Sequence, residues 1–96
     1  MRRLTDEQIA SAVVQTAWER EGDAIVREIR FGDFTAAVAF VNRVAELAEK
    51  VNHHPDILLH GWNRVRLTLS THSEGGITEA DVDLARAIDA TVASVA

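Results

Sequence analysis

The chain has 96 residues, of which 47% are hydrophobic and 26% charged, close to the average of a soluble globular domain. This length supports one hydrophobic core, so we predict a single domain over residues 1–96, and the composition excludes disordered and low-complexity chains. The absence of cysteine excludes a disulfide scaffold, a thiolate nucleophile and a Cys-ligated zinc site, and the formal charge of −5 argues against nucleic acid as a direct partner.

The first predicted helix begins at a capping box, because Thr5-Asp6-Glu7-Gln8 places a hydroxyl and an amide three residues apart. It runs to about residue 13 or 14. A β-hairpin follows, with arms at 18–21 and 24–31 separated by Gly22-Asp23. Glycine accepts the positive φ that the first position of a type II′ turn requires, so we predict that turn here.

The clearest helical pattern covers Asp33 to about Asn52, with Asp33 as a suitable N-cap. Pro55, the only proline, restricts His54 and ends this element. Apolar residues recur every three or four positions along the helix, and we expect this stripe to face the core. The stripe consists of Phe34, Val38, Val41, Ala45, Ala48 and Val51.

A second pair of strands and a final helix complete the chain. The apolar run 57–60 is interrupted by residues 61–63, and residues 64–72 then alternate as in a strand with one buried face. Val65, Leu67, Leu69 and Thr71 share the buried face, and His72 ends the strand on the other. The final helix begins near Thr78, with Val82, Ala85, Ile88, Val92 and Val95 directed inward.

The order αββαββα predicts an α+β fold, in which a four-stranded antiparallel sheet is covered on one face by helices. So small a sheet leaves exposed edge strands, which favour pairing between copies of the chain. We therefore expect a homodimer or homotetramer, with the alanine-rich residues 85–96 as a candidate contact surface.

Targeting and membrane segments are not expected. The N-terminus has two arginines and then turns acidic without an apolar run, which is unlike a signal peptide or an anchor. No stretch approaches the roughly 18 apolar residues that span a bilayer. We expect a cytoplasmic protein without a membrane partner.

Histidines mark the candidate site. His53 and His54 stand at the end of the long helix and His72 at the end of the alternating strand, and histidine readily exchanges protons near neutral pH. A helix C-terminus stabilises a protonated imidazole. Glu49 precedes His53 by four residues, so we expect it on the same helix face, where it would orient that ring. The residues alone thus predict a proton-transfer site.

Each residue also has a structural interpretation. Asp81 with Thr78 forms a capping box in its own right, Glu49 is equally a solvated helix carboxylate, and His54 a helix-ending residue with its ring in solvent. His60 matches no catalytic pattern. A metal site is not expected, because adjacent helical residues project about 100° apart and cannot easily reach one ion.

Taken together, these residues resemble the pterin-4a-carbinolamine dehydratase family. The resemblance covers nearly the whole chain and rests on Glu49, His53-His54-Pro55, the strand end Leu67 to His72, Gly76 and Asp81. It implies the same element order and the dehydration of a 4a-hydroxytetrahydropterin to the quinonoid dihydropterin, in support of pterin recycling. Water leaves from C4a and N5 loses a proton, and neither step needs a metal or an organic cofactor.

The resemblance also implies residue roles. By match to the family motif, His53 and His72 are the acid/base pair, and His54 holds the pterin ring and assists at its hydroxyl group. Glu49 supports His53, and Asp81 orients or polarises a catalytic histidine. Which histidine acts as acid and which as base stays open.

Substrate contacts are implied at His54, Pro55, Trp62 and Thr71. Trp62 or Phe31 would supply an apolar wall for the flat pterin. Two departures from the family pattern lie nearby. Trp62 stands where the family commonly has tyrosine or phenylalanine, and the stretch from Pro55 to Trp62 is one residue longer than in its commonest form.

A non-catalytic module on the same fold is the alternative function. The family includes dimerisation partners of a transcription factor, and similar domains assist assembly of a carbon-fixing enzyme. A module that had lost catalysis would be free to lose its histidines. His53, His54 and His72 are all present, which favours the enzyme.

Overall fold

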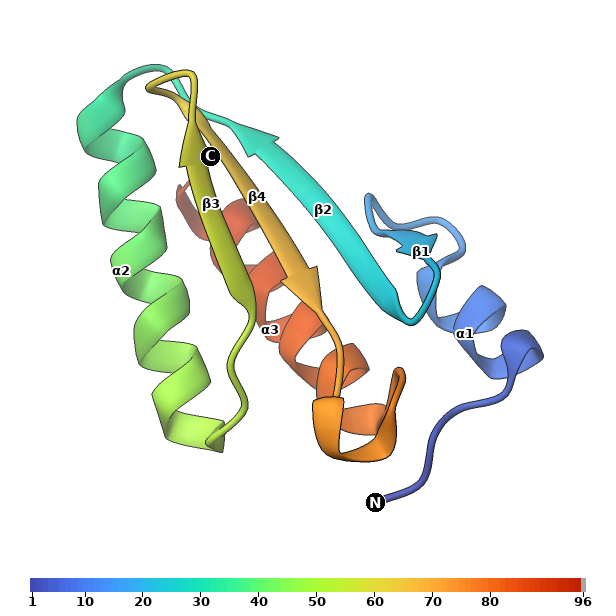
Figure 1. Cartoon of the computed structure of the whole chain (residues 1–96). Coiled ribbons are helices and arrows are strands. Elements are labelled where there is room, and N and C mark those ends of the chain that lie inside the picture. The colour runs from blue at the N-terminus through green and yellow to red at the C-terminus, as the bar shows by residue number, and fades with distance from the viewer. Residues whose placement is uncertain (96) are drawn as a thin grey trace.

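A computed structural model describes residues 1–95 of the chain (Figure 1). The expected inward side chain of Val95, and Ala96 at the end of the expected contact helix, lie outside the described residues. The elements are α1 (Asp6–Val13), β1 (Glu19–Glu21), β2 (Ala24–Arg30), α2 (Phe34–Val51), β3 (Asp56–His60), β4 (Arg64–Leu69), the short 3₁₀ helix η1 (His72–Glu74) and α3 (Glu79–Val95). Within residues 1–95, each helix is too short or too polar to cross a membrane.

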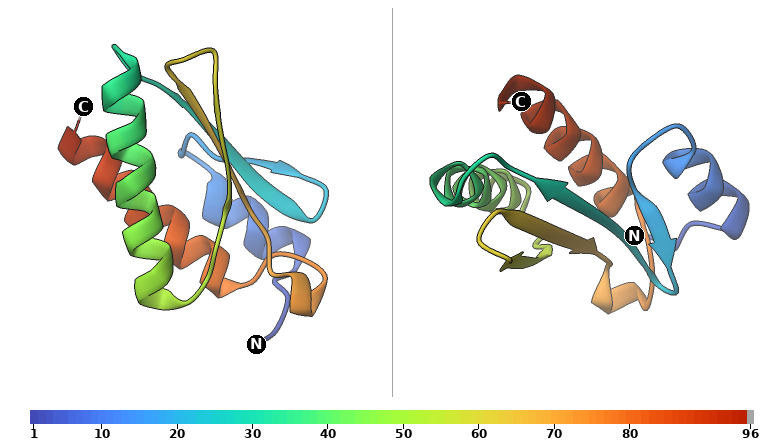
Figure 2. Two further views of the ribbon diagram at one scale, coloured as in Figure 1. Left: turned by 60° about the vertical axis from the view of Figure 1, so that its left-hand side comes forward. Right: turned by 90° about the horizontal axis from the view of Figure 1, so that it is seen from above.

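The four strands form one antiparallel sheet in the order β1-β2-β4-β3. Helices α2 and α3 cover one face of this sheet (Figure 2). The α+β fold with a helix-covered antiparallel sheet is therefore confirmed. The central strands β2 and β4 pair from Ile25 with Leu69 to Arg30 with Arg64, so their apolar positions face the helices together.

The predicted capping box of α1 and the predicted turn of the first hairpin are confirmed. Thr5 caps α1 through a complete capping box, in which Gln8 N–H donates to Thr5 Oγ1 at 3.1 Å and Thr5 N–H donates to Gln8 Oε1 at 2.8 Å. In the first hairpin, Gly22 has φ 61°. Its neighbour Asp23 is not among the positive-φ residues, as expected for a type II′ turn.

The core lies between the helices and the inward positions of the strands. Val65, Leu67 and Leu69 of β4 are fully buried, which confirms the alternating pattern. The rest of the core comes from the helices, the other strands and the segments that precede β1 and α3, and consists of Ile9, Trp18, Ile25, Ile29, Ala37, Phe40, Val44, Ile77, Leu84, Ala85 and Ile88. This packing fixes the ends of the elements that carry the predicted site residues.

The buried face of α2 differs from the prediction. Asp33 caps the helix as expected, its side chain accepting from Ala36 N–H at 2.7 Å. Of the predicted stripe, only Ala48 is fully buried, whereas Phe34 and Val51 are 54% and 56% exposed. The buried positions are Ala37, Phe40, Val44 and Ala48. Both stripes have helical spacing, and the stripe that packs against the sheet is the one that contains Phe40. The ring centroid of Phe40 lies 5.0 Å from that of Phe31.

Candidate functional site

The predicted histidines and Asp81 belong to segments that meet at one end of the sheet (Figure 1). His53 and His54 lie between α2 and β3, His72 begins η1, and Asp81 lies in the first turn of α3. Hydrogen bonds to Asp81 from His53 and from Thr71 tie these segments together. The fold thus joins residues up to 28 positions apart in the sequence.

The end of α2 sets the directions of the two adjacent histidines. Asn52 is left-handed, with φ 52° and ψ 44°, and His53 N–H donates to Ala48 O at 3.1 Å, as at many helix C-termini. Because the chain leaves the helical path at Asn52, His53 does not lie one turn above Glu49. The predicted contact between Glu49 and His53 is wrong, and Glu49 Oε2 lies 2.5 Å from His54 Nε2 instead.

His53 faces α3, where it meets the buried carboxylate of Asp81. Its Nε2 lies 2.6 Å from Asp81 Oδ1, and the two side chains are 16% and 0% exposed. An ionised carboxylate only accepts hydrogen bonds, so Nε2 is the protonated nitrogen in this pair. Nδ1 of His53 is then free of Asp81 and is the ring nitrogen available to another partner.

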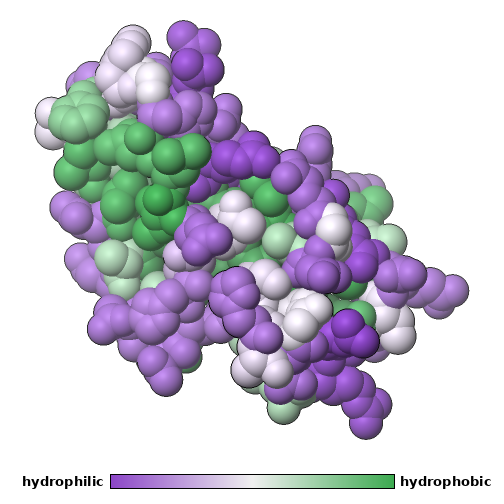
Figure 3. Space-filling model, viewed as in Figure 1, coloured by the Kyte–Doolittle hydropathy of each residue, from purple (hydrophilic) through white to green (hydrophobic). Residues whose placement is uncertain are grey.

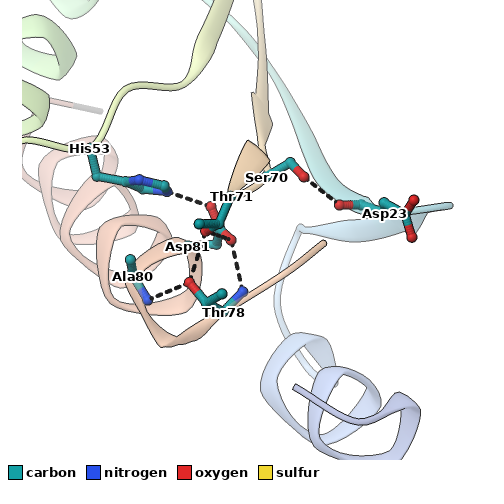
Figure 4. A network of polar contacts seen from close by, with 7 residues as sticks. All are labelled: Asp23, His53, Ser70, Thr71, Thr78, Ala80 and Asp81. Atoms are coloured by element: carbon teal, nitrogen blue, oxygen red, sulfur yellow. Dashed lines mark hydrogen bonds and ion pairs between the residues drawn. The ribbon is translucent and has the colours of Figure 1, made fainter. Parts of the chain in front are cut away.

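The second oxygen of Asp81 is held from two directions (Figure 4). Thr71 Oγ1 donates to Asp81 Oδ2 at 2.8 Å, and Thr78 N–H donates to the same oxygen at 2.9 Å. Ala80 N–H donates to Thr78 Oγ1 at 3.2 Å, which completes a helix cap. Asp81 therefore has both roles: it forms the capping box of α3 with Thr78, and it is the hydrogen-bond partner of His53.

His72 lies on a tight loop rather than on a strand. β4 ends at Leu69, and Thr71 pairs with Gly76 through a hydrogen bond from Thr71 N–H to Gly76 O of 2.8 Å. Gly75, with φ 70°, allows the loop to close and donates its N–H to His72 O at 3.1 Å. The predicted strand over residues 64–72 is thus three residues too long, and the His72 side chain is exposed.

The hydroxyl group of Thr71 is already used within the protein. It is buried, donates to Asp81 and lies 2.8 Å from Thr78 Oγ1. Burial of this hydroxyl group among protein partners argues against the expected substrate contact at Thr71, which stays a prediction. Alternation along the strand had placed this side chain on the buried face, a signal that conflicts with a substrate contact.

The two expected aromatic walls lie at the other end of the sheet. Trp62 is in the turn between β3 and β4 and is 60% exposed, and Phe31 N–H donates to Asn63 O of the same turn. The five residues of β3, a span of roughly 17 Å, separate this turn from Pro55. Within one chain neither Trp62 nor Phe31 reaches the histidines. The longer stretch after Pro55 ends in this three-residue turn, where Gly61 and Trp62 have positive φ.

An apolar cavity of about 410 Å³ adjoins His53. It was not predicted, although Ala80, Leu84 and Ala87 have the spacing of one helix face. It lies between the last turns of α2 and the first turns of α3, and its lining is Met1, Leu47, Lys50, Val51, His53, Glu79, Ala80, Asp83, Leu84 and Ala87. Among residues 1–95, no three His, Asp or Glu side chains are grouped as in a metal site.

Comparisons with known proteins identify similar sequences and a similar fold. The model of the family described as pterin 4 alpha carbinolamine dehydratase matches residues 2–91. A protein of Thermomicrobium roseum named "Putative pterin-4-alpha-carbinolamine dehydratase" is 58% identical over 90% of this chain and 92% of its own length. A crystal structure described as a transcriptional coactivator/pterin dehydratase from Brucella melitensis has a TM-score of 0.87 and 39% identity, covering 93% of this chain and 97% of that one.

A second solved structure is more distant. It is described as a pterin dehydratase-like protein identified as a RuBisCO assembly factor in the alpha-carboxysome. Its TM-score is 0.66 at 28% identity, and the match covers 79% of this chain and 89% of that one.

Proposed function

The chain belongs to the pterin-4-alpha-carbinolamine dehydratase family, and we propose that it dehydrates a 4a-hydroxytetrahydropterin to the quinonoid dihydropterin. The observation that carries this proposal is the 2.6 Å contact between His53 and the buried Asp81, at the same end of the sheet as the exposed side chains of His54 and His72. A buried carboxylate behind a partly exposed imidazole is an arrangement that suits acid/base catalysis.

The reaction balances without a co-reactant. The C4a–O bond breaks, the departing hydroxyl group takes a proton and leaves as water, N5 gives up its proton, and a C4a–N5 double bond forms. One group must therefore donate a proton and another must accept one.

We assign the base to His53. Its Nε2–H is directed to Asp81, which leaves Nδ1 to accept the N5 proton, and the Asp81 carboxylate stabilises the imidazolium that results. His72 stands on a separate loop at the exposed rim and is assigned as the acid at the departing hydroxyl group.

His54 is proposed to hold the pterin ring. Its side chain is 57% exposed, and its Nε2 is engaged with Glu49. Glu49 then acts on His54 rather than on His53, and it fixes the ring orientation without burying it. Pro55 follows directly and limits the backbone freedom of this segment.

A coupled assay tests the function. An aromatic hydroxylase generates the 4a-hydroxytetrahydropterin, and its decay is followed with and without the protein. We expect the wild type to accelerate the decay, and His54→Ala or His72→Ala to reduce that acceleration by about 10²-fold, the scale of a lost acid/base group.

His60→Ala is the matched control. His60 also pairs with a carboxylate, Glu28, at 2.7 Å, but on the sheet face turned away from the helices. This variant is expected to retain the wild-type rate. A folded wild-type protein that gives no acceleration would contradict the dehydratase and favour the alternative, a non-catalytic binding or assembly module on this fold.

We further propose that the chain is a homodimer or homotetramer. β3 lies at the edge of the sheet, and exposed apolar side chains of α2 and β3, including Phe34, Ile57 and Leu58, form a surface there (Figure 3). A second copy paired along β3 would cover part of it. On α3, by contrast, Ala85 and Ile88 of the expected contact surface belong to the core. A sedimentation mass of one chain at micromolar concentration would contradict this proposal.

A further inference from the structure

Thr71 stands between the two histidines assigned to proton transfer. We propose that Thr71 is a positioning residue: its hydroxyl group holds Asp81, and through it His53, while its backbone holds the loop of His72. The proposal rests on the proposed dehydratase function for its catalytic consequence. Its structural part, the orientation of His53, can be measured without any substrate.

The proton positions in the buried cluster follow from what each atom can donate. Asp81 Oδ2 only accepts, so the single hydroxyl proton of Thr71 is directed to it over 2.8 Å. Thr78 Oγ1 lies 2.8 Å from Thr71 Oγ1, and with the Thr71 proton committed, Thr78 is the donor of that pair. Ala80 N–H in turn donates to Thr78. These three hydrogen bonds form a series that runs toward Asp81, so each bond polarises the next.

Capping of α3 does not require Thr71. A cap needs only the contacts between Thr78 and the first turn, and Thr78 N–H to Asp81 Oδ2 already provides one. The Thr71 hydroxyl adds a second donor to the same oxygen from a different segment, the connection between β4 and η1. Two donors from two directions fix the plane of the carboxylate. Oδ1 is thereby directed at His53 Nε2, and the ring is held as the Nε2–H tautomer.

The backbone of Thr71 holds the second histidine. Thr71 N–H donates to Gly76 O at 2.8 Å, and Thr71 O accepts from Glu74 N–H at 3.0 Å. These bonds close the loop that begins with His72. One buried residue therefore sets the placement of both imidazoles, each through a different chemical group.

Thr71→Val tests the hydroxyl group, because valine keeps the shape and removes the donor. Thr71→Ser restores the donor. Thr68→Val is the matched control, since Thr68 lies on β4, three residues before Thr71, with its side chain on the sheet face turned away from the core, and no side-chain hydrogen bond joins it to any residue in 1–95. The measurements are kcat and KM in the coupled assay, and long-range ¹H–¹⁵N spectra that report the tautomer of His53.

We expect Thr71→Val to lower kcat about 10- to 100-fold, the usual effect of losing a hydrogen bond behind a reacting group, and to change KM by less than about threefold. The spectrum of this variant should show His53 as a mixture of both tautomers. Thr71→Ser and Thr68→Val should keep the Nε2–H tautomer and kcat within about threefold of the wild type.

Three results would overturn the proposal. One is an unchanged His53 tautomer in Thr71→Val, and another is a kcat of that variant equal to that of Thr68→Val. The third is an equal loss in Thr71→Ser and Thr71→Val, which would assign the effect to packing. If the wild type shows no turnover, the proposed function fails by itself, and the tautomer comparison alone decides whether Thr71 positions His53.

Discussion

Trp18 and Asp89, which lie 71 positions apart in the sequence, are joined by a hydrogen bond of 2.8 Å from the indole Nε1 to Oδ1 of the carboxylate. The same oxygen accepts from Arg27 at 2.5 Å. A single carboxylate on α3 thus anchors both β2 and the segment that precedes β1.

Asp89→Ala should destabilise the protein by about 2 kcal/mol, because it leaves the largely buried Arg27 guanidinium and the Trp18 indole without their shared acceptor. Urea unfolding at a fixed protein concentration measures the change. Asp83→Ala, at an exposed position of the same helix, should change stability by less than about 0.5 kcal/mol. An equal loss of stability in the two variants would show that the negative charge on the helix, rather than the contact of Asp89 with Arg27 and Trp18, stabilises the protein.

Asp81→Asn should lower kcat by about 10²-fold or more. An amide presents a donor as well as an acceptor, so it no longer enforces the Nε2–H tautomer of His53 or stabilises its protonated form. The coupled assay measures the effect. Asp23→Asn, at an exposed position in the turn of the first hairpin, is the control and should retain wild-type kcat. Retention of activity in Asp81→Asn would remove His53 from its assigned role as base.

Glu49→Gln should raise KM and leave the stability of the protein almost unchanged. The pair of Glu49 with His54 is 76% and 57% exposed, and exposed pairs contribute only about 0–1 kcal/mol, so the unfolding midpoint should barely move. If Glu49 orients the ring that holds the pterin, KM should rise several-fold at a nearly constant kcat. Glu46→Gln, earlier on α2, is the control. A large fall in kcat with an unchanged KM would instead link Glu49 to proton transfer.

Leu58→Asp should dissociate the proposed dimer or tetramer. Leu58 is 53% exposed on the edge strand β3, and a charge buried in an interface without a partner is strongly unfavourable. Sedimentation equilibrium at micromolar concentration should show a lower mass than the wild type. Val14→Asp, which changes an exposed apolar residue at the end of α1, should leave the mass unchanged. An unchanged mass in Leu58→Asp would place the interface elsewhere.

Local signals predicted the elements of this chain well. The capping box at Thr5, the turn at Gly22 and the N-cap at Asp33 are each set by contacts within a few residues, and all three are present. The buried pattern of β4 was also predicted, because a strand with one buried face alternates strictly. The α+β class followed from these elements in order.

Predictions from the sequence differ from the structure where contacts between distant segments determine how a side chain is placed. Two apolar stripes compete on α2, and only the sheet selects the one with Phe40. The family resemblance implies a substrate contact at Trp62, but β3 separates this residue from Pro55 and places it at the opposite end of the sheet. Glu49 was paired with the wrong histidine because a single left-handed residue, Asn52, changes the direction of the chain.

The two edges of the sheet are not equivalent. β1 has only three residues, Glu19, Arg20 and Glu21, all exposed and charged, and it lies beside α1, whereas β3 carries exposed leucine and isoleucine. Charged short strands resist pairing with another chain. A sheet that can grow at only one edge accepts one further copy and then stops, so pairing along β3 yields a closed two-fold dimer rather than a fibre. A tetramer would require a second, different surface.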